Sequence, residues 1–469
     1  MGDLQAGLEQ VVSGNADSFI APVPSVKSAR LLPLRLLGER AEQLRGALSS
    51  EKGIAQGLFS LADQGVASIT NFVTGVIIAR ASSKEEFGLY MLGFTLILLV
   101  TDLQTSLIAT PYMVYAPRLK SDEHALYAGS TLIHQVAFSL LTMLALAGAS
   151  LATRFGLGPA GVRPILLALT AVVSLIMLRE FTRRICFARL KLTSAFVFDA
   201  CICIGQLGGL LLLAHFHILS ASTAYWLIGS VCGIAVLCWL WLDRRFYRLR
   251  FDESITDLKR NWTFGRWVFA SGLLATASTN LYPWLIAFFH GTAAAGVFAA
   301  CLGVVSASNP MLLGIQNFVG PKIAHEFAAN GAKALRRLAL KISAILALPV
   351  SALTLTLVLW GDHFIALLYG NRYAGNGLVV SILALNLLVS ALVFSFSRAL
   401  FAIERADLDF WFNLAAFLTM ATLGLALVRS YGPLGAAFGL LLANTVTSAI
   451  RTAVFLRLPV HSTTEVGTE

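Results

Sequence analysis

Charged residues are scarce in this chain. Asp, Glu, Lys and Arg make up 13% of the 469 residues, and hydrophobic residues make up 57%. A soluble domain normally has about 25% charged residues, so the composition excludes an ordinary soluble protein. A membrane β-barrel is excluded as well, because it would show short strands of alternating polarity. The composition therefore predicts a membrane protein built from helices.

Motifs of the common enzyme and metal sites are also missing. There is no Walker loop, no metal-binding helix motif and no nucleophile elbow. The six cysteines show neither zinc spacing nor a disulfide framework. The net charge of +10 is spread over loops, where topology and anionic lipids explain it, so we expect no nucleic-acid partner. We expect a protein that is not an enzyme and needs no cofactor beyond a coupling ion, either Na⁺ or H⁺.

Long apolar runs separated by short polar links extend from about residue 55 to residue 457. A helix needs about 20 apolar residues to cross a bilayer. Twelve segments meet this requirement, at residues 58–79, 87–109, 126–151, 164–182, 194–214, 221–242, 266–289, 294–318, 339–360, 375–397, 410–429 and 432–455. We therefore predict an all-α integral membrane protein with twelve transmembrane helices.

Lys and Arg residues are unevenly divided between the two sets of links. Of the 35 in the chain, 29 fall in the terminal segments and in every second link. Cytoplasmic loops carry the excess of Lys and Arg, so we expect both termini in the cytoplasm. The first 50 residues are polar, and we expect no cleavable signal peptide. Residues 30–45 place leucines on one helical face, which fits either a helix on the inner leaflet or a partly disordered tail.

The chain contains one internal repeat. Residues 87–90 (FGLY) correspond to residues 295–298 (AGVF), and Phe198-Asp199 corresponds to Phe412-Asn413. Each copy holds six spans, an even number, so both copies enter the membrane in the same direction. We therefore predict two parallel six-helix bundles, related by a pseudo-two-fold axis along the membrane normal, with a cleft between them.

The repeat and the loops divide the chain into five predicted parts. They are a cytoplasmic N-terminal extension (1–52), a first six-helix bundle (53–250), a cytoplasmic linker (251–265), a second six-helix bundle (266–457) and a cytoplasmic tail (458–469).

The first predicted helix carries a family resemblance. The sequences GLFSLADQGVASITNFVTGVIIAR at 57–80 and SKEEFGLY at 83–90 resemble the polysaccharide biosynthesis and O-antigen flippases. These belong to the multidrug/oligosaccharidyl-lipid/polysaccharide exporter superfamily, and the layout of twelve spans in two copies extends the resemblance over most of the chain. It implies that an undecaprenyl-diphosphate-linked saccharide is moved from the inner to the outer leaflet by alternating access. The extension before Gly53 is longer than is usual in that family.

Polar residues of the first span lie on one helical face. Gln64, Ser68, Asn71 and Gly75 follow the spacing i, i+4, i+7 and i+11. A polar stripe is costly in lipid, so it faces protein or water. One interpretation is that it lines the cleft, with Gln64 and Asn71 binding substrate. The other is that it holds neighbouring helices together, as polar side chains in membranes commonly do.

Four ionisable residues of the first half lie at membrane depth. They are Asp63, Asp102, His134 and Asp199. A charge near the bilayer centre costs about 2.5–3.5 kcal/mol on insertion scales, so such groups need partners or a hydrated cavity. The second half carries amides instead, so we expect ion or proton coupling to involve these four residues. The alternative is that Asp63 and Asp199 cap helices near the interface or pair with cytoplasmic arginines.

A diphosphate headgroup, implied by the resemblance, would need arginines, which make bidentate contacts to phosphate. Candidates near the ends of spans are Arg80, Arg179, Arg266, Arg398 and Arg451. We assign Arg80, Arg266 and Arg398 to substrate binding. The competing interpretation is that these residues set topology and extend to the headgroup layer.

The seventh span contains the sequence Tyr282-Pro283-Trp284. Pro283 removes a helical hydrogen bond and predicts a bend there. Tyr282 and Trp284 would stack on sugar rings at that bend, or they belong to the aromatic belt at the membrane interface.

These patterns favour a multi-pass transporter, and the family resemblance implies its substrate. We therefore expect a flippase that exports undecaprenyl-diphosphate-linked oligosaccharide across a bacterial inner membrane for cell-surface polysaccharide synthesis. The expected partners are the lipid-linked oligosaccharide, membrane lipids, a polysaccharide polymerase and glycosyltransferases. One alternative is a cation-coupled small-molecule or drug antiporter of the same superfamily. Another is a non-transporting membrane scaffold for polysaccharide assembly. A lipid II flippase is disfavoured because those relatives usually have fourteen spans.

Overall fold

The structure is a computed structural model that describes residues 51–457, apart from residues 245, 404 and 406. It contains two compact units, Met1–Gly57 and Leu58–Glu469. Only the start of helix α3 is described in the first unit. The predicted N-terminal extension up to residue 50, including residues 30–45, and the predicted tail at 458–469 lie outside the described residues.

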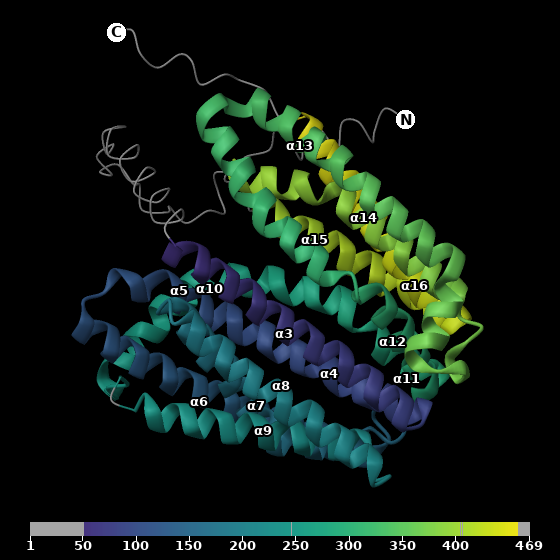
Figure 1. Cartoon of the computed structure of the whole chain (residues 1–469), viewed down its shortest axis with the longest axis horizontal. Helices are drawn as coiled ribbons and strands as arrows, with labels where there is room; N and C mark the ends of the chain where they lie inside the picture. The colour runs from purple at the N-terminus through teal and green to yellow at the C-terminus, as the bar shows by residue number, and fades with distance from the viewer. Residues whose placement is uncertain (1–50, 245, 404, 406, 458–469) are drawn as a thin grey trace. The chain divides into compact units, whose positions relative to one another are not determined.

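The described part of the chain is helical, and the only irregular segments in it are short connections (Figure 1). The first half comprises α3 (Glu51–Ala81), α4 (Lys84–Gln104), η2 (Thr105–Ala109), α5 (Thr110–Tyr115), η3 (Ala116–Arg118), α6 (Ser121–Ala152), η4 (Thr153–Phe155), α7 (Val162–Ala188), α8 (Leu192–His215) and α9 (Ala221–Leu242). The second half comprises α10 (Phe251–Asn280), α11 (Tyr282–His290), α12 (Thr292–Ser306), α13 (Asn309–Tyr369), η5 (Asn371–Tyr373), α14 (Gly377–Ala402), α15 (Asp407–Thr419), η6 (Met420–Gly424) and α16 (Leu425–Arg457).

Local sequence signals determine several helix ends. The hydroxyl of Ser83 accepts a hydrogen bond from the backbone N–H of Glu86 (3.2 Å) and so caps α4. The π-helical turn η2 lies just before Pro111. Proline has no N–H, so it interrupts the hydrogen-bond ladder of the helix at this point. The bend predicted at Pro283 is confirmed, since α10 ends at Asn280 and α11 begins at Tyr282.

The twelve predicted crossings are recovered from the helices of the described residues. Nine of those helices are long and apolar enough to cross a bilayer unaided. One of the nine, Asp407–Arg457, is bent at Gly432 (φ 56°) and supplies two crossings. The broken pair α10–α11 supplies another, and the short apolar helix α12 continues into the first part of α13 to supply the last. A second bend, at Gly331 (φ 72°), separates that part of α13 from the following span.

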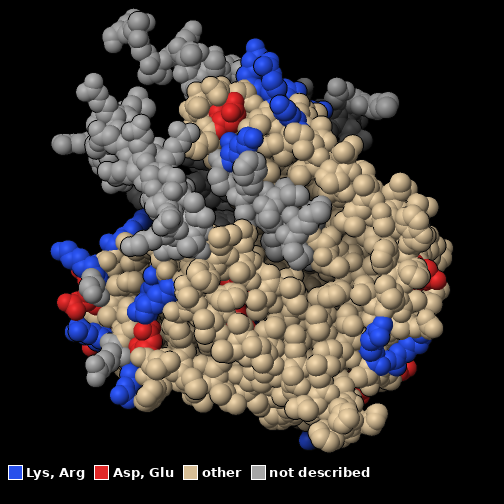
Figure 2. Space-filling view, in the orientation of Figure 1, with Lys and Arg blue, Asp and Glu red and all other residues tan. Residues whose placement is uncertain are grey.

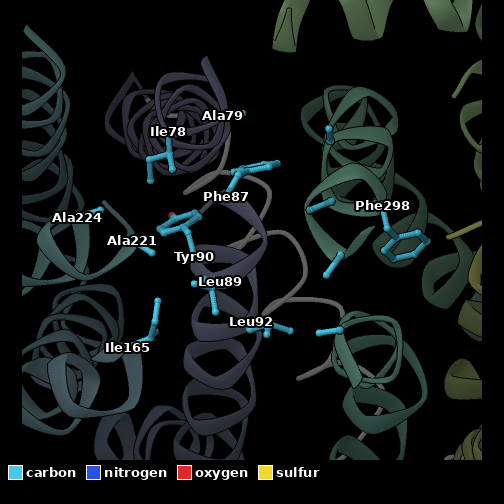
Figure 3. Close-up of a cluster of buried hydrophobic side chains, with 14 of the residues drawn as sticks. Ile78, Ala79, Phe87, Leu89, Tyr90, Leu92, Ile165, Ala221, Ala224 and Phe298 are labelled. Carbon is cyan, nitrogen blue, oxygen red and sulfur yellow. The ribbon is translucent and has the colours of Figure 1, made fainter. Parts of the chain in front are cut away.

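The main hydrophobic core joins the two halves. It contains Ile78 of α3, Phe87, Tyr90 and Leu92 of α4, and Phe298 of α12 (Figure 3). Each of these side chains is at most 3% exposed. Inside a bilayer, lipid tails are as apolar as these side chains, so close van der Waals packing provides most of the stabilisation between helices.

Glycines allow α4 and α12 to approach closely. A Cβ atom on Gly88 would overlap the backbone carbonyl of Thr292, and a Cβ atom on Gly296 would overlap the carbonyl of Lys84. These two glycines occupy matching positions of the internal repeat. Small residues at such crossings let two backbones pack directly, as is common in membrane helix pairs.

Charged residues occupy the margins of the face that Figure 2 shows. Lys and Arg gather near α5 and α10 at the lower left, over α13 at the top, and near the junction of α3 and α4 at the lower right. The surface between these groups carries almost no charge. An uncharged band between charged margins is expected of helices that cross the hydrocarbon layer.

Residues 251–265, predicted as a linker, form the first turns of α10. They lie along α6 of the first half, because Tyr127 donates a hydrogen bond to Asn261 (2.8 Å) and the ring of His134 bonds the carbonyl oxygen of Ser254 (2.8 Å). The chain therefore enters its second half as a helix that is already bound to the first half.

Candidate functional site: a row of three cavities

An ion-pair network lies where α3, α7 and α8 meet. The guanidinium of Arg183 bonds the Asp63 carboxylate (Nη2 to Oδ2, 2.6 Å) and lies 2.8 Å from Asp199. Arg179 bonds the other oxygen of Asp199 (2.7 Å), and Glu180 lies within ion-pair distance of both arginines. Both aspartate side chains are fully buried. Ion pairing offsets the cost of burying these charges at membrane depth.

Part of this network opens onto a cavity of about 280 Å³, called here the middle cavity. Arg179, Glu180 and Arg184 of α7 form one wall of this cavity. The side chain of Arg184 is 35% exposed and bonds Glu180 (2.7 Å). Asn71 of α3 and Asp102 of α4 also line the middle cavity. Its wall is therefore polar, with both guanidinium and carboxylate groups.

Two further cavities adjoin the middle cavity and lie between the halves. The wide cavity, about 1020 Å³, shares Asp102 and Thr105 with it and is otherwise lined mainly by α10 and α15. The end cavity, about 350 Å³, shares Asn71 and Tyr90 with it and is otherwise lined by α3, α4 and helices α10–α13. The three cavities form a row. The middle cavity is lined by helices of the first half alone, whereas the wide and end cavities lie on the boundary between the two halves.

The carboxylate of Asp102 lies where the middle and wide cavities meet. It is exposed and accepts a hydrogen bond from the Thr276 hydroxyl of α10 (2.7 Å). Among the described residues, no lysine or arginine forms an ion pair with it. Asn413, the repeat counterpart of Asp199, lines the wide cavity and donates to Ser271 (3.0 Å). Both halves thus present a polar side chain from matching helices to the cavity row.

The polar stripe predicted on α3 is divided between the cavities and the helix bundle. Ser68, Asn71 and Gly75 line the end cavity. Gln64 is half-buried and is not among the residues that line the three cavities. Thr74, on the neighbouring face, accepts a hydrogen bond from Gln206 of α8 (2.8 Å) and so helps to hold α3 in place.

The four residues predicted for ion coupling have different surroundings. Asp63 and Asp199 pair with arginines, which is the alternative that the sequence left open for them. His134 is buried between α6 and α10 and lines none of the three cavities. Asp102 has an exposed carboxylate in a cavity. Their role in coupling stays a prediction.

The three arginines assigned to substrate binding do not line these cavities. Arg80 donates to the carbonyl oxygen of Leu368 at the end of α13 (2.8 Å). Arg398 lies over the ring of Phe394 on its own helix (5.0 Å to the centroid). Arg266 is exposed on α10. Their assignment stays a prediction, but in this conformation Arg179 and Arg184 are the arginines that line a cavity of the row.

The two aromatic candidates of the seventh span are both engaged in packing. Tyr282 is fully buried, and its hydroxyl would lie only 2.6 Å from a Cβ atom on Gly424 and 2.7 Å from one on Gly439. Trp284 is half-buried and donates from its indole N–H to the hydroxyl of Thr95 on α4 (2.9 Å). Trp284 therefore links the halves beside the end cavity, whereas Tyr282 belongs to the packing of the second half.

Sequence reasoning missed Arg184 and gave Arg183 no role. Both fall in a basic link, 179–193, that topology alone explains. The helix α7 continues to Ala188, six residues past the predicted end of the fourth span, and so places them inside the bundle. The pattern of Arg179, Glu180, Arg183 and Arg184 was the available signal, because i, i+3 and i+4 spacing brings these side chains together on one helix.

No group of three or more His, Cys, Asp or Glu side chains is arranged to hold a metal ion in the part of the chain that the structure describes. The polar groups of the cavity row are instead hydroxyls, amides, carboxylates and two arginines. Such a wall suits a ligand with many hydroxyl groups and an anionic moiety.

Two parallel six-helix bundles, with one cavity inside the first bundle and two on the boundary between the bundles, form a multi-pass membrane transporter fold. Among solved structures, the chain is similar to an inward-facing multidrug resistance MATE family transporter of the MOP superfamily (TM-score 0.67, 13% identity, 86% of this chain and 94% of that chain). It is also similar to the lipid II flippase MurJ in an inward closed conformation (0.63, 14%, 86% and 88%). A MOP superfamily transporter from Pyrococcus furiosus matches as well (0.61, 13%, 86% and 94%). At these identities the likeness concerns the fold.

The family itself follows from the sequence. The model of the polysaccharide biosynthesis protein family matches residues 54–324, more than half of the chain, and the chain belongs to this family. A search of curated protein sequences finds no match. The predicted fold class, with twelve helices in two bundles, and the predicted family are both confirmed.

Proposed function

We propose that this protein flips an undecaprenyl-diphosphate-linked oligosaccharide from the inner to the outer leaflet of a bacterial inner membrane. The observation that carries the proposal is the row of three cavities, one in the first half and two on the boundary between the halves, in a polysaccharide biosynthesis family member. Their walls combine apolar side chains with guanidinium, carboxylate, amide and hydroxyl groups. A saccharide needs a hydrated path through the hydrocarbon layer, because its hydroxyl groups are costly to bury without hydrogen bonds. The polyprenyl tail would remain in lipid at the boundary between the halves.

The wide cavity has the size and side chains for a saccharide. Trp411 and Phe410 supply aromatic rings, and Asp409 and Asn413 supply hydrogen-bonding groups. Sugars offer apolar faces for stacking and hydroxyl groups for hydrogen bonds, so this mixture suits them. In this proposal the wide cavity is open to the cytoplasm, as the loop charges predict.

The diphosphate would contact α7 in the middle cavity. Arg184 and Arg179 present guanidinium groups there, and arginine makes strong bidentate bonds to phosphate oxygens. Arg179 is already bound to Asp199, whereas Arg184 is the more exposed of the two. We therefore assign the larger share of headgroup binding to Arg184.

Transport against a gradient needs an energy source, and we propose coupling to H⁺ or Na⁺ at Asp102. A coupling carboxylate must be reachable from the cavity and must change its partner during the cycle. Asp102 meets the first requirement. Its bond to Thr276 crosses between the halves, so movement of the halves would change it.

A deletion strain tests the proposal. We expect lipid-linked saccharide to accumulate on the cytoplasmic leaflet and surface polysaccharide to be lost, with both restored by the wild-type gene on a plasmid. Loss of surface polysaccharide without accumulation would support a scaffold for the polymerase and glycosyltransferases. An unchanged lipid-linked pool together with normal surface polysaccharide would contradict the proposal.

A cation-coupled small-molecule antiporter is the second candidate, because the MATE transporters share the fold. In that case too the coupling would fall to Asp102, since a cation at Asp63 or Asp199 would have to displace Arg183 and Arg179. Drug sensitivity of the deletion strain with an unchanged lipid-linked pool would favour this candidate.

A further inference from the structure

Two arginines bridge the halves where α3 and α13 end. Arg80, in the last turn of α3, donates from Nε to the carbonyl oxygen of Leu368 (2.8 Å) and from Nη2 to that of Leu367. Arg372, just after α13, donates from Nη2 to the carbonyl oxygens of Ala79 and Arg80 (2.6 Å each). Each half thus contributes an arginine that binds the end of a helix in the other half.

The acceptors are suited to cations. The last four carbonyl groups of a helix have no partner within the helix, and they form the negative end of its dipole. Leu367 and Leu368 are among the last residues of α13, which ends at Tyr369. Ala79 and Arg80 hold the same place in α3, which ends at Ala81. A guanidinium group at such a position donates hydrogen bonds to the unpaired carbonyl oxygens, and its positive charge also offsets the negative end of the helix dipole.

The segment that carries Arg372 is held firmly. Oδ1 of Asp362 accepts hydrogen bonds from the backbone N–H groups of Gly375 (2.7 Å), Asn376 (3.0 Å) and Gly377 (3.2 Å). These bonds fix the turn between α13 and α14. Arg372 therefore reaches α3 from a preorganised turn.

An aromatic layer lies beside the arginine bridge. Phe87 of α4 contacts Tyr369 and Tyr373 of the second half, with ring centroids 5.9 and 6.1 Å apart. Phe87 and Tyr369 also line the end cavity. The layer therefore borders the end cavity, and the two arginines join the halves beside it.

We propose that Arg80 and Arg372 form a reciprocal latch, called here the arginine latch, that holds this end of the cleft shut. The latch rests on the proposed alternating access: it stabilises the conformation in which the wide cavity is open, and it must release before substrate leaves at the other side. Arg80 and Arg372 are then positioning residues of the gate. This role differs from the substrate-binding role that the sequence suggested for Arg80.

The experiment measures access to the end cavity from outside. Ser68→Cys places a thiol in that cavity, and a membrane-impermeant thiol reagent is applied to intact cells that express the full chain. The parent protein without Ser68→Cys gives the background from the six native cysteines. We compare the labelling rate with and without Arg80→Ala, Arg372→Ala, and both together. Arg163→Ala is the matched control, because it removes a positive charge from the start of α7 on the same predicted side of the membrane.

Loss of the latch should raise labelling from outside by about tenfold in the double variant and less in each single variant, as expected when a few net hydrogen bonds are lost. Labelling from the cytoplasmic side, in inverted vesicles, should fall at the same time. The lysine variants Arg80→Lys and Arg372→Lys should restore part of the closure, and they test the latch even if the double alanine variant fails to fold.

Unchanged outside labelling in the alanine and lysine variants would overturn the latch. An equal rise from both sides, or the same rise in Arg163→Ala, would also overturn it, because either result indicates general loosening. The assay reads conformation without substrate. Its result therefore does not depend on the lipid-linked saccharide pool. The size of that pool is the separate measurement that tests the proposed function.

Discussion

Asp102 of α4 and Thr276 of α10 are joined by a hydrogen bond between Oδ2 and Oγ1 (2.7 Å). The bond connects the two halves at a point where two cavities meet. A carboxylate in this place can exchange its hydroxyl partner for a proton, a Na⁺ ion or water when the halves separate. Asp102 thus combines access to the cavity with sensitivity to the arrangement of the halves.

Neutralising this carboxylate should separate transport from the ion gradient. We expect Asp102→Asn to fold and to lose gradient-driven transport, because the amide neither binds a proton nor attracts a cation. Flipping of lipid-linked saccharide in proteoliposomes, with and without an imposed pH or Na⁺ gradient, measures this. Thr276→Val is the control: it removes the hydrogen bond but keeps the carboxylate and should keep the gradient dependence. Full gradient-driven activity in Asp102→Asn would remove the coupling role.

The ion pairs around Arg183 should be essential for stability. Arg183→Ala leaves Asp63 without its arginine at membrane depth, and we expect a loss of about 3–5 kcal/mol, as for other broken buried pairs. Thermal unfolding in detergent measures the effect. The double variant Asp63→Asn/Arg183→Met should recover much of the loss, since it removes both charges. Equal stability of Arg183→Ala and wild type would show that water already solvates Asp63.

Arg184 offers a matched test of function on the same helix. Its side chain is 35% exposed, so Arg184→Ala should cost less than about 1 kcal/mol of stability. We expect it to weaken binding of the lipid-linked diphosphate by about tenfold or more, because hydrogen bonds to charged groups contribute about 1.5–3 kcal/mol. Arg184→Lys should retain part of the affinity. The control Arg163→Ala changes an exposed arginine at the start of the same helix, outside the cavity row, and should bind normally. Similar binding by all three variants would contradict the role of α7.

The features that depend on composition and local sequence were predictable. Apolar runs and the distribution of Lys and Arg predict the twelve crossings, and Pro283 predicts the break between α10 and α11. The need of Asp63 and Asp199 for partners at membrane depth was also foreseeable, and arginines were named among the partners.

The features that depend on distant contacts were not predictable. An arginine that ends a span to set topology and one that enters an ion pair look the same in a single sequence, so Arg183 was read as part of a loop. Arg372 and Arg80 lie 292 residues apart, and no local pattern relates them.

The close crossing of α4 and α12 gives a test of packing that does not involve charge. A Cβ atom on Gly88 would overlap a backbone carbonyl, which cannot rotate away as a side chain can. We expect Gly88→Ala to push the helices apart and to cost about 1–3 kcal/mol.

Gly148→Ala, in α6, is the matched control for Gly88→Ala. A Cβ atom there would meet nothing within 4 Å, so the change should be neutral or stabilise the helix by up to about 1 kcal/mol. Thermal unfolding of both variants in the same detergent measures the difference. Because the crossing lies beside the aromatic layer, Gly88→Ala should also raise outside labelling of Ser68→Cys, whereas Gly148→Ala should not. Equal unfolding temperatures for the two variants would mean that α4 and α12 are not in direct backbone contact.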